Sequence, residues 1–317
     1  MNAPRTAVVV NPVKVPDLDR LRRTIVDGLA TAGWPEPQWY STTREDPGYG
    51  QARTAVEQGA ELVFVCGGDG TVMAVVSALA GTDVALAVIP AGTGNLLAAN
   101  LGLNGDVATG VEIALQGGRR RIDVGVCGDK CFAVMAGMGF DAQMLEGTSE
   151  TAKKHIGWIA YVGGALKHLR DRPMPVVISL DGKPALRRRP RTVIVGNVGR
   201  LQGGVRLLAQ ADPADGLLDV AILSPRNLAH WAALSWAVIR RRERIPRMET
   251  YTAKRVEIRG LQPQPRQLDG DLIEPGASMS ITVRPRALLL CVPQPAGDPD
   301  LAYDSGAAEK AAAERLK

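Results

Sequence analysis

An apolar run that ends in a glycine-rich turn constrains the fold more than any other feature of this chain. The run over residues 63–66 leads into five turn residues: Gly67, Gly68, Asp69, Gly70 and Thr71. A helix-compatible segment follows over residues 72–80. Because glycine lacks a Cβ, its backbone N–H groups can approach an anion closely, and the N-terminus of a following helix favours phosphate. The order strand, glycine turn, helix therefore predicts a nucleotide site in an α/β fold, although it lacks the Walker A pattern.

A second glycine loop follows the apolar run over residues 85–89. Its residues are Gly92, Thr93, Gly94 and Asn95, and residues 96–101 have helical character. Two such units place both loops at the C-terminal edge of one parallel sheet, where open α/β sheets bind ligands. A single loop of this kind is more often a tight turn, but two in register favour a nucleotide. Asp69 suits a metal ion or a hydroxyl better than a bare phosphate.

Three polar side chains follow the first two predicted strands. Asn11 and Lys14 come after the strand over residues 7–10, and Thr42 follows the strand that begins at residue 39. Side chains at these positions reach the same sheet edge as the glycine loops. Lys14 would neutralise a phosphate as a point charge, or it is an exposed surface lysine.

The chain changes character near residue 120. Before it, strands alternate with helices, which predicts a parallel α/β nucleotide-binding domain over residues 1–120. After it, strands follow strands over residues 121–126, 130–136, 176–180, 192–195 and 218–223, with helices over residues 151–169 and 227–242. Residues 121–285 are therefore predicted to form an antiparallel β-sandwich-like domain with added helices. Residues 293–317 are Ala-rich and polar and predict a flexible tail.

The composition is that of a cytoplasmic enzyme. With 45% apolar and 22% charged residues, the chain can bury a core in each domain. The sequence contains no run of 18 apolar residues, so no membrane span is expected. Its first residues do not have the pattern of a secretion signal. The four cysteines lack C-x-x-C spacing, so reduced thiols are expected.

The two glycine loops together resemble the diacylglycerol kinase catalytic domain family of soluble lipid kinases, which includes sphingosine kinases. The order of motifs is similar over residues 5–292. It continues with Gly-Met-Gly-Phe-Asp-Ala at residues 137–142 and with Gly196-Asn197 followed by Gly203-Gly204. The resemblance implies transfer of the γ-phosphoryl group of ATP to a lipid hydroxyl, with Mg²⁺ and with diacylglycerol as the first choice of substrate. It also implies that a strand over about residues 286–292 returns to the first domain.

The resemblance further implies a structural magnesium ion just before the predicted strand at residue 218. Asp215 would bind it by its side chain, and Asp212 and Leu217 by their backbone carbonyls. Oxygen ligands from a tight acidic turn suit magnesium. A simple Asp-Gly turn is the alternative.

The segment Asp269-Gly270-Asp271 carries the chemistry in this interpretation. Asp269 would match the family's catalytic base, and Asp69 would help to hold a catalytic magnesium ion. Asp271 stands where the family has Glu, and its shorter side chain leaves its reach into the active site open. Taken alone, Asp-Gly indicates a hairpin turn.

Two other classes of function stay open. A NAD kinase-like enzyme shares the first glycine motif and phosphorylates a soluble dinucleotide. The other class is a catalytically inactive protein that binds a lipid or a nucleotide. Asp271 makes this possible, because it stands where the family has Glu.

Two arginine clusters decide which partners are expected. They are Arg187, Arg188, Arg189 and Arg191, and Arg240, Arg241, Arg242, Arg244 and Arg247. They predict either solvated surfaces or peripheral contact with anionic lipid headgroups at the inner membrane face. No nucleic-acid partner is expected, because aromatic platforms and nucleic-acid motifs are lacking. A homodimer stays open.

Overall fold

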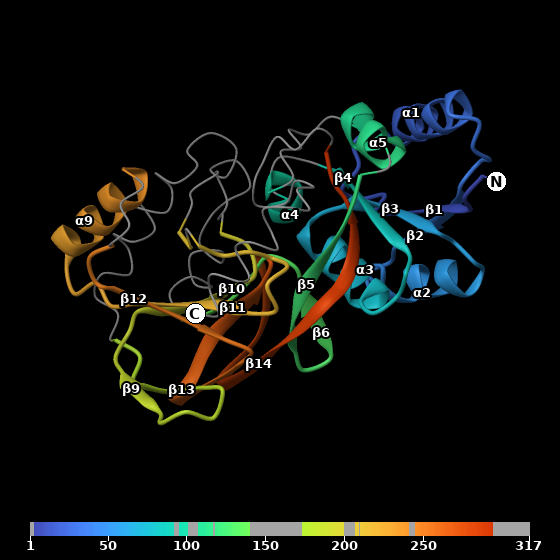
Figure 1. Cartoon of the computed structure of the whole chain (residues 1–317). Coiled ribbons are helices and arrows are strands. Elements are labelled where there is room, and N and C mark those ends of the chain that lie inside the picture. Colours follow the sequence, from blue (N-terminus) through green and yellow to red (C-terminus); the bar gives the residue numbers. More distant parts are fainter. Residues whose placement is uncertain are drawn as a thin grey trace. The chain divides into compact units, whose positions relative to one another are not determined.

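The computed structural model describes residues 3–91, 95–100, 107–116, 118–139, 173–199, 207–208, 210–240 and 245–293 (Figure 1). The chain divides into two compact units. Unit 1 comprises Met1–Val124, Pro213–Asp215 and Pro285–Lys317. Unit 2 comprises Gly125–Asp212 and Gly216–Arg284.

Unit 1 is built on a parallel sheet. Its strands are β1 (Thr6–Val10), β2 (Gln38–Ser41), β3 (Leu62–Gly67) and β4 (Ala85–Pro90). β1 pairs with β2 and β3, and β3 pairs with β4, all in parallel. The end of β14 (Asp271–Cys291) adds a further parallel partner to β4, with Leu289 opposite Ala85. Every residue of β1, β3 and β4 is buried, as expected for strands covered on both faces.

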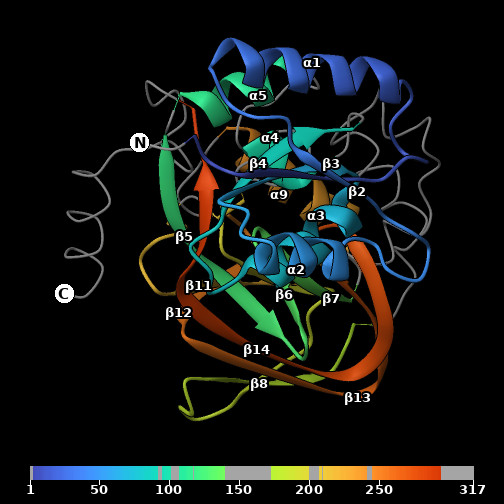
Figure 2. The ribbon, with the colours of Figure 1, turned by 90° about the vertical axis from the view of Figure 1, so that its right-hand side faces the viewer.

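Helices cover both faces of this sheet. They are α1 (Leu18–Thr31), α2 (Tyr49–Glu57), α3 (Asp69–Leu79), α4 (Leu96–Asn100) and α5 (Val107–Leu115). Figure 2 shows α1 beside α5 on one face and α2 on the other. α1 begins at an N-cap, Asp17, and buries Leu21, Ile25 and Leu29, which share one helical face.

Unit 2 is predominantly antiparallel. Its main sheet has the order β12 (Met248–Ala253), β11 (Leu218–Leu223), β10 (Thr192–Gly196), β7 (Met135–Gly139), β13 (Arg255–Leu268) and β14. β8 (Val176–Leu180) pairs with β13 and with β9 (Leu186–Arg188). The end of β5 (Arg119–Cys127) forms a hairpin with β6 (Lys130–Phe132), and α9 spans Leu228–Ile239. The predicted combination of a parallel α/β part and an antiparallel β-sandwich-like part is confirmed.

One arginine fills an irregularity between β13 and β14. The register shifts between Arg259 and Gln264 and again before Arg266. The Arg266 guanidinium donates to the Glu274 carbonyl through Nε at 2.8 Å and Nη2 at 2.6 Å, and to the Ser278 carbonyl through Nη1 at 2.9 Å. A Cβ at Gly276 would lie 2.6 Å from Arg266 Cζ, so the guanidinium occupies the space that this glycine leaves.

Several sequence predictions fall outside the described residues. These include the helix over residues 151–169, residues 140–142 and 203–204 of the family motifs, Arg241, Arg242 and Arg244, and the tail from residue 294. Among the described helices, none has the length and apolar character needed to cross a lipid bilayer.

Candidate functional site

The first glycine turn joins the end of β3 to the start of α3. A Cβ at Gly67 would lie 2.6 Å from the Thr71 Cβ, so packing requires glycine there. Gly68 is different, because its φ of −82° and ψ of −176° are open to any residue and a Cβ would meet nothing within 4 Å. Neither backbone conformation nor packing within the chain therefore requires glycine at position 68. Gly70 lies half-buried in the first turn of α3.

Asp69 connects the two glycine loops. Its Oδ1 accepts a hydrogen bond of 2.8 Å from the backbone N–H of Leu96, which begins α4 just after the second loop. Asp69 is also the acidic residue in the first turn of α3, where a negative charge complements the helix dipole. The carboxylate that the sequence assigned to magnesium thus also holds two loops together.

Asn95 ends the second loop and is only 7% exposed. Its Oδ1 accepts from the Ala98 N–H at 2.8 Å. Its Nδ2 is buried and has no hydrogen-bond partner among the residues that the structure describes. Such a donor destabilises a protein by about 1–3 kcal/mol unless it is satisfied, so an oxygen of a bound ligand suits it. Gly92, Thr93 and Gly94 lie outside the described residues.

Asn11 lies beside the first glycine turn. Its Nδ2 donates to Thr71 Oγ1 at 3.3 Å, while its Oδ1 accepts from the N–H groups of Val13 and Lys14 at 3.1 and 3.3 Å. Lys14 is exposed. Thr42 is 8% exposed and its N–H donates to the Val10 carbonyl at the end of β1. The structure therefore brings Asn11 and Thr71 into contact and joins Asp69 to the start of α4. Lys14 follows Asn11 closely in the chain, and Thr42 lies beside the end of β1 in the sheet.

Asp269 and Gly270 form the two-residue turn between β13 and β14, closed by the pair Leu268 and Asp271. Both turn residues have positive φ, 48° and 92°, as a type I′ hairpin requires. The hairpin interpretation is therefore correct as far as it goes. It does not explain why Asp269 is only 4% exposed, since turn aspartates are ordinarily solvated.

Three consecutive backbone amides hold the Asp269 carboxylate. The Ala133 N–H donates to Oδ2 at 2.8 Å, and the N–H groups of Val134 and Met135 donate to Oδ1 at 2.9 and 2.8 Å. Burial is the largest influence on this group and raises the pKa of Asp269 from 3.8 to about 6, although the three amides oppose the rise. The half-buried Asp271 raises it further by charge repulsion. A carboxyl group that titrates near pH 6 is suited to accept a proton at neutral pH.

Asn197 lies behind these amides. Its Nδ2 donates to the Ala133 carbonyl at 2.8 Å, and its backbone N–H donates to the Val134 carbonyl at 2.8 Å. The sequence offered Gly196-Asn197 only as part of a family motif, and no contact with the Asp269 segment could be foreseen. The distance of 64 residues between Asn197 and Ala133 hides such a contact from local patterns.

Asp212, Asp215 and Leu217 lie in the turn before β11, where Gly216 has a φ of 75°. Both aspartates are half-buried. Within the described ranges, no three His, Cys, Asp or Glu side chains gather as a metal site. The predicted magnesium site uses one carboxylate side chain and two carbonyls, so this finding does not bear on it.

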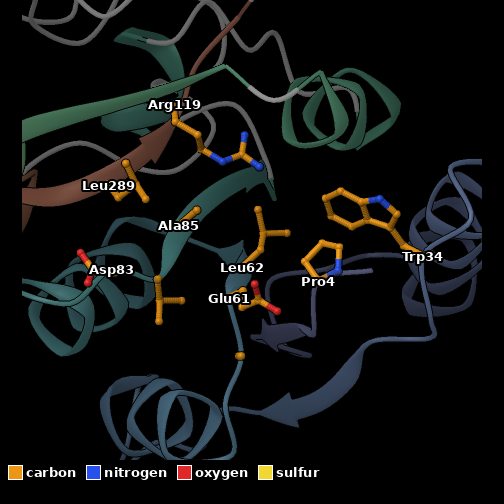
Figure 3. Close-up of a pocket in the computed structure, with 10 residues that line it drawn as sticks. Pro4, Trp34, Glu61, Leu62, Asp83, Ala85, Arg119 and Leu289 are labelled. Atoms are coloured by element: carbon orange, nitrogen blue, oxygen red, sulfur yellow. The ribbon is translucent and has the colours of Figure 1, made fainter. Parts of the chain in front are cut away.

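A cavity of about 430 Å³ lies elsewhere in unit 1 (Figure 3). Trp34 and Arg119 line it together with Leu62 and Ala85, the first residues of β3 and β4. It is therefore at the N-terminal ends of these strands, whereas the glycine loops follow their C-terminal ends. None of the predicted site residues lines it.

Two protein-family models together match nearly the whole chain. The diacylglycerol kinase catalytic domain matches residues 5–127, and the YegS C-terminal NAD kinase beta sandwich-like domain matches residues 134–292.

Individual relatives carry kinase names. A protein of Pseudomonas putida named "Probable lipid kinase YegS-like" is 32% identical over 78% of this chain and 82% of its own length. The diacylglycerol kinase of Mycobacterium tuberculosis is 33% identical over 53% of this chain. The matched part spans 56% of the length of that relative. The diacylglycerol kinase of Bacillus subtilis is 27% identical over 84% of this chain and 89% of its own length. A solved structure of a diacylglycerol kinase from Bacillus anthracis shares the fold, with a TM-score of 0.71 at 21% identity over 93% of this chain and 99% of that one.

Proposed function

Because the chain belongs to the diacylglycerol kinase catalytic domain family, we propose that it is an ATP-dependent lipid kinase. It transfers the γ-phosphoryl group to a lipid hydroxyl, and diacylglycerol is the expected acceptor. The names of relatives from three genera support the class of reaction. The identity of the acceptor is the finer part of the proposal.

The observation that carries the nucleotide part of the proposal is the pair of linked glycine loops in unit 1. Gly68 presents open space beside a helix N-terminus, and the buried Nδ2 of Asn95 suits an acceptor oxygen. Backbone amides at a helix start and an unsatisfied side-chain amide are what phosphate oxygens require. Lys14 adds a positive charge after β1. We assign the binding of ATP to these residues.

Asp269 of unit 2 serves as the base. Its carboxylate accepts the proton of the lipid hydroxyl as that oxygen bonds to the γ-phosphorus. The bond from phosphorus to the bridging oxygen breaks and ADP leaves. Oδ1 already accepts two backbone N–H groups and Oδ2 accepts one, so Oδ2 is the better placed oxygen for the proton. Bound Mg²⁺ would neutralise phosphate charge in such a reaction, and Asp69 is the side chain proposed to help hold it. Asp215 is proposed to hold a separate, structural magnesium ion.

A phosphorylation assay with labelled ATP tests the proposal. The full chain is incubated with Mg²⁺ and mixed micelles of diacylglycerol, phosphatidylglycerol or a sphingoid base, and separately with NAD. Label in the product of diacylglycerol is expected, and no label in NADP. Label in NADP alone would instead support the dinucleotide kinase. ATP binding with no phosphorylated product from any acceptor would leave a binding protein.

The Asp269→Asn variant tests the base. Turnover should fall by about a hundredfold or more, while ATP binding persists. An asparagine amide would face the N–H groups of residues 133–135, so circular dichroism and the thermal midpoint are needed to show that the variant folds. Near-normal turnover in a folded Asp269→Asn variant would remove the assignment.

A further inference from the structure

The segment that holds the Asp269 carboxylate is itself held from its other side. It lies between β6 and β7 and contributes two peptide groups, one joining Ala133 to Val134 and one joining Val134 to Met135. In a trans peptide the N–H and the C=O point in opposite directions. The N–H of each of these two peptides donates to Asp269 Oδ1.

The carbonyl of each peptide is bound by Asn197 or its neighbour. Asn197 Nδ2 donates to the Ala133 carbonyl at 2.8 Å. The Asn197 N–H donates to the Val134 carbonyl at 2.8 Å, and the Val198 N–H donates to the same oxygen at 3.2 Å. Two continuous chains of hydrogen bonds therefore run from Asn197 through a peptide group to Oδ1 of Asp269.

Hydrogen bonds in such a chain strengthen one another. A donor at a peptide carbonyl polarises the peptide and makes its N–H a better donor, by roughly 10–30% per bond. All of the groups are buried: Asn197 is 1% exposed, Val134 0% and Asp269 4%. Water therefore does not compete for these bonds, and the polarisation acts at full strength.

We propose that Asn197 is the positioning residue for Asp269: it fixes and polarises the two peptide groups that orient the carboxylate and stabilise its charged form. The inference rests on the proposed role of Asp269 as the base. Asn197 contacts no substrate in this proposal and acts only through the segment of residues 133–135.

The surroundings of Asp269 simplify a titration. Residues 132–139, which bind Asp269, and residues 192–199, which pair with that segment, contain no titratable side chain. Among the residues that the structure describes, Asp271 on the same hairpin is the charged group that acts on the pKa of Asp269. A change in the titration of Asp269 on substitution of Asn197 would therefore report on the hydrogen bonds.

The Met135 amide offers a readout that requires no enzyme activity. The full chain is prepared with carbonyl-labelled valine and amide-labelled methionine, so that only Val–Met pairs give a correlated NMR signal. The sequence has two such pairs, Val72-Met73 and Val134-Met135. The first serves as an internal reference, and the second reports protonation of the Asp269 carboxyl group, because the Met135 N–H donates to its Oδ1. Asp269→Asn identifies the signal, because its shift with pH should then disappear.

The test compares Asn197→Leu with Thr192→Val. Leucine has the same branched shape and the same number of side-chain heavy atoms, but it cannot donate to the Ala133 carbonyl. Thr192 begins β10, the strand that ends just before Asn197, and is 3% exposed. It donates through Oγ1 to the Met138 carbonyl at 3.2 Å, so Thr192→Val removes a buried hydrogen bond between β10 and β7 away from Asp269. The wild-type midpoint is expected near pH 6. It should rise by about half a pH unit in Asn197→Leu and stay unchanged in Thr192→Val.

Kinase assays on the same proteins add a second readout. The acid limb of the kcat profile should move to higher pH in Asn197→Leu, with the KM for ATP unchanged. The hydroxyl group of Asn197→Ser is too short to reach the Ala133 oxygen, so this variant should behave as Asn197→Leu does. It replaces Asn197→Leu if the leucine variant does not fold.

Two results would overturn the proposal. One is a folded Asn197 variant in which Asp269 titrates with the same midpoint as in the wild type. The other is failure of both Asn197 variants to fold while Thr192→Val folds, because Asn197 would then serve the fold rather than the carboxylate. If the wild-type protein shows no kinase activity, the proposed function is wrong. The NMR comparison still decides whether Asn197 acts on Asp269.

Discussion

At the scale of single residues, the sequence marks candidate side chains but not the backbone groups that surround them. Asp269 was predicted both as a hairpin residue and as a base; its positive φ fits the hairpin, whereas its burial is more than a hairpin turn explains. Its three amide partners could not be predicted, because Ala133, Val134 and Met135 have no polar side chains to mark them. Backbone groups bind without a signature in the sequence, so the local pattern gave no sign of these three hydrogen bonds.

The elevated pKa of Asp269 gives a pH dependence of stability. Its folded value of about 6 exceeds 3.8, so its stabilising effect is complete below about pH 4 and is lost as the pH rises through 6. A rise of about 2 units corresponds to about 3 kcal/mol. Relative to Asp269→Asn, which does not titrate, wild type should lose about that much unfolding free energy between pH 4 and pH 7. Urea unfolding of both proteins at the two pH values measures the difference, and a constant difference would contradict the raised pKa.

Gly68 offers a graded test of nucleotide binding. Its backbone angles suit any residue and its Cβ position is open, so Gly68→Ala and Gly68→Val should both fold with nearly unchanged thermal midpoints. If phosphate oxygens occupy that space, the Kd for ATP should rise by about tenfold or more in the alanine variant and further in the valine variant. Isothermal titration calorimetry measures it. Gly67→Ala, which meets Thr71, should instead lower the thermal midpoint. Unchanged ATP affinity in folded Gly68→Val would contradict the nucleotide site.

At the scale of elements, strong periodicity gave accurate predictions and interrupted patterns did not. The strand predicted over residues 218–223 is β11, and the helix predicted over residues 227–242 is α9, Leu228–Ile239. β13 and the part of β14 before about residue 286 were missed, although these are the longest strands described. Pro263, Pro265 and Pro275 interrupt their alternation, and such residues ordinarily end a strand. The irregular register and Arg266 accommodate them, which depends on contacts between strands.

Arg266 should stabilise this irregular pair measurably. Its guanidinium satisfies the carbonyls of Glu274 and Ser278 over Gly276. Arg266→Met should lower the unfolding free energy by about 2 kcal/mol. Gly276→Ala should cost a similar amount, because the added methyl displaces the same guanidinium. The double variant should then be little worse than either single one, as measured by urea unfolding. Fully additive losses would show that the two positions act independently.

At the scale of the whole molecule, the proposed substrate raises the question of how the enzyme reaches a bilayer. We propose that α9 makes this contact. Trp236 is 52% exposed, and the Arg240 guanidinium carbon lies 4.6 Å from its ring centroid. An exposed tryptophan beside arginine suits the membrane interface and anionic headgroups.

Vesicle co-sedimentation tests this contact. Each arginine near an anionic surface contributes about 1 kcal/mol, so replacing Arg240, Arg241 and Arg242 by Gln should weaken binding to phosphatidylserine vesicles by about a hundredfold at low salt. A control variant with Gln at Arg187 and Arg189, two exposed arginines of the other cluster, should bind as wild type does. Equal binding of all three proteins would rule out docking through α9.

The return of β14 to unit 1 has a consequence for the order in which the protein is made. β4 acquires its partner at Leu289 only after residues 125–284 have been synthesised, long after residues 1–124 have left the ribosome. At about 5–20 residues per second, the nascent sheet waits roughly ten to thirty seconds with an open edge beside β4, and open edges invite pairing with other chains. The unit that is synthesised first is thus completed last, and during this interval a chaperone or a slow collapse must cover the edge of β4.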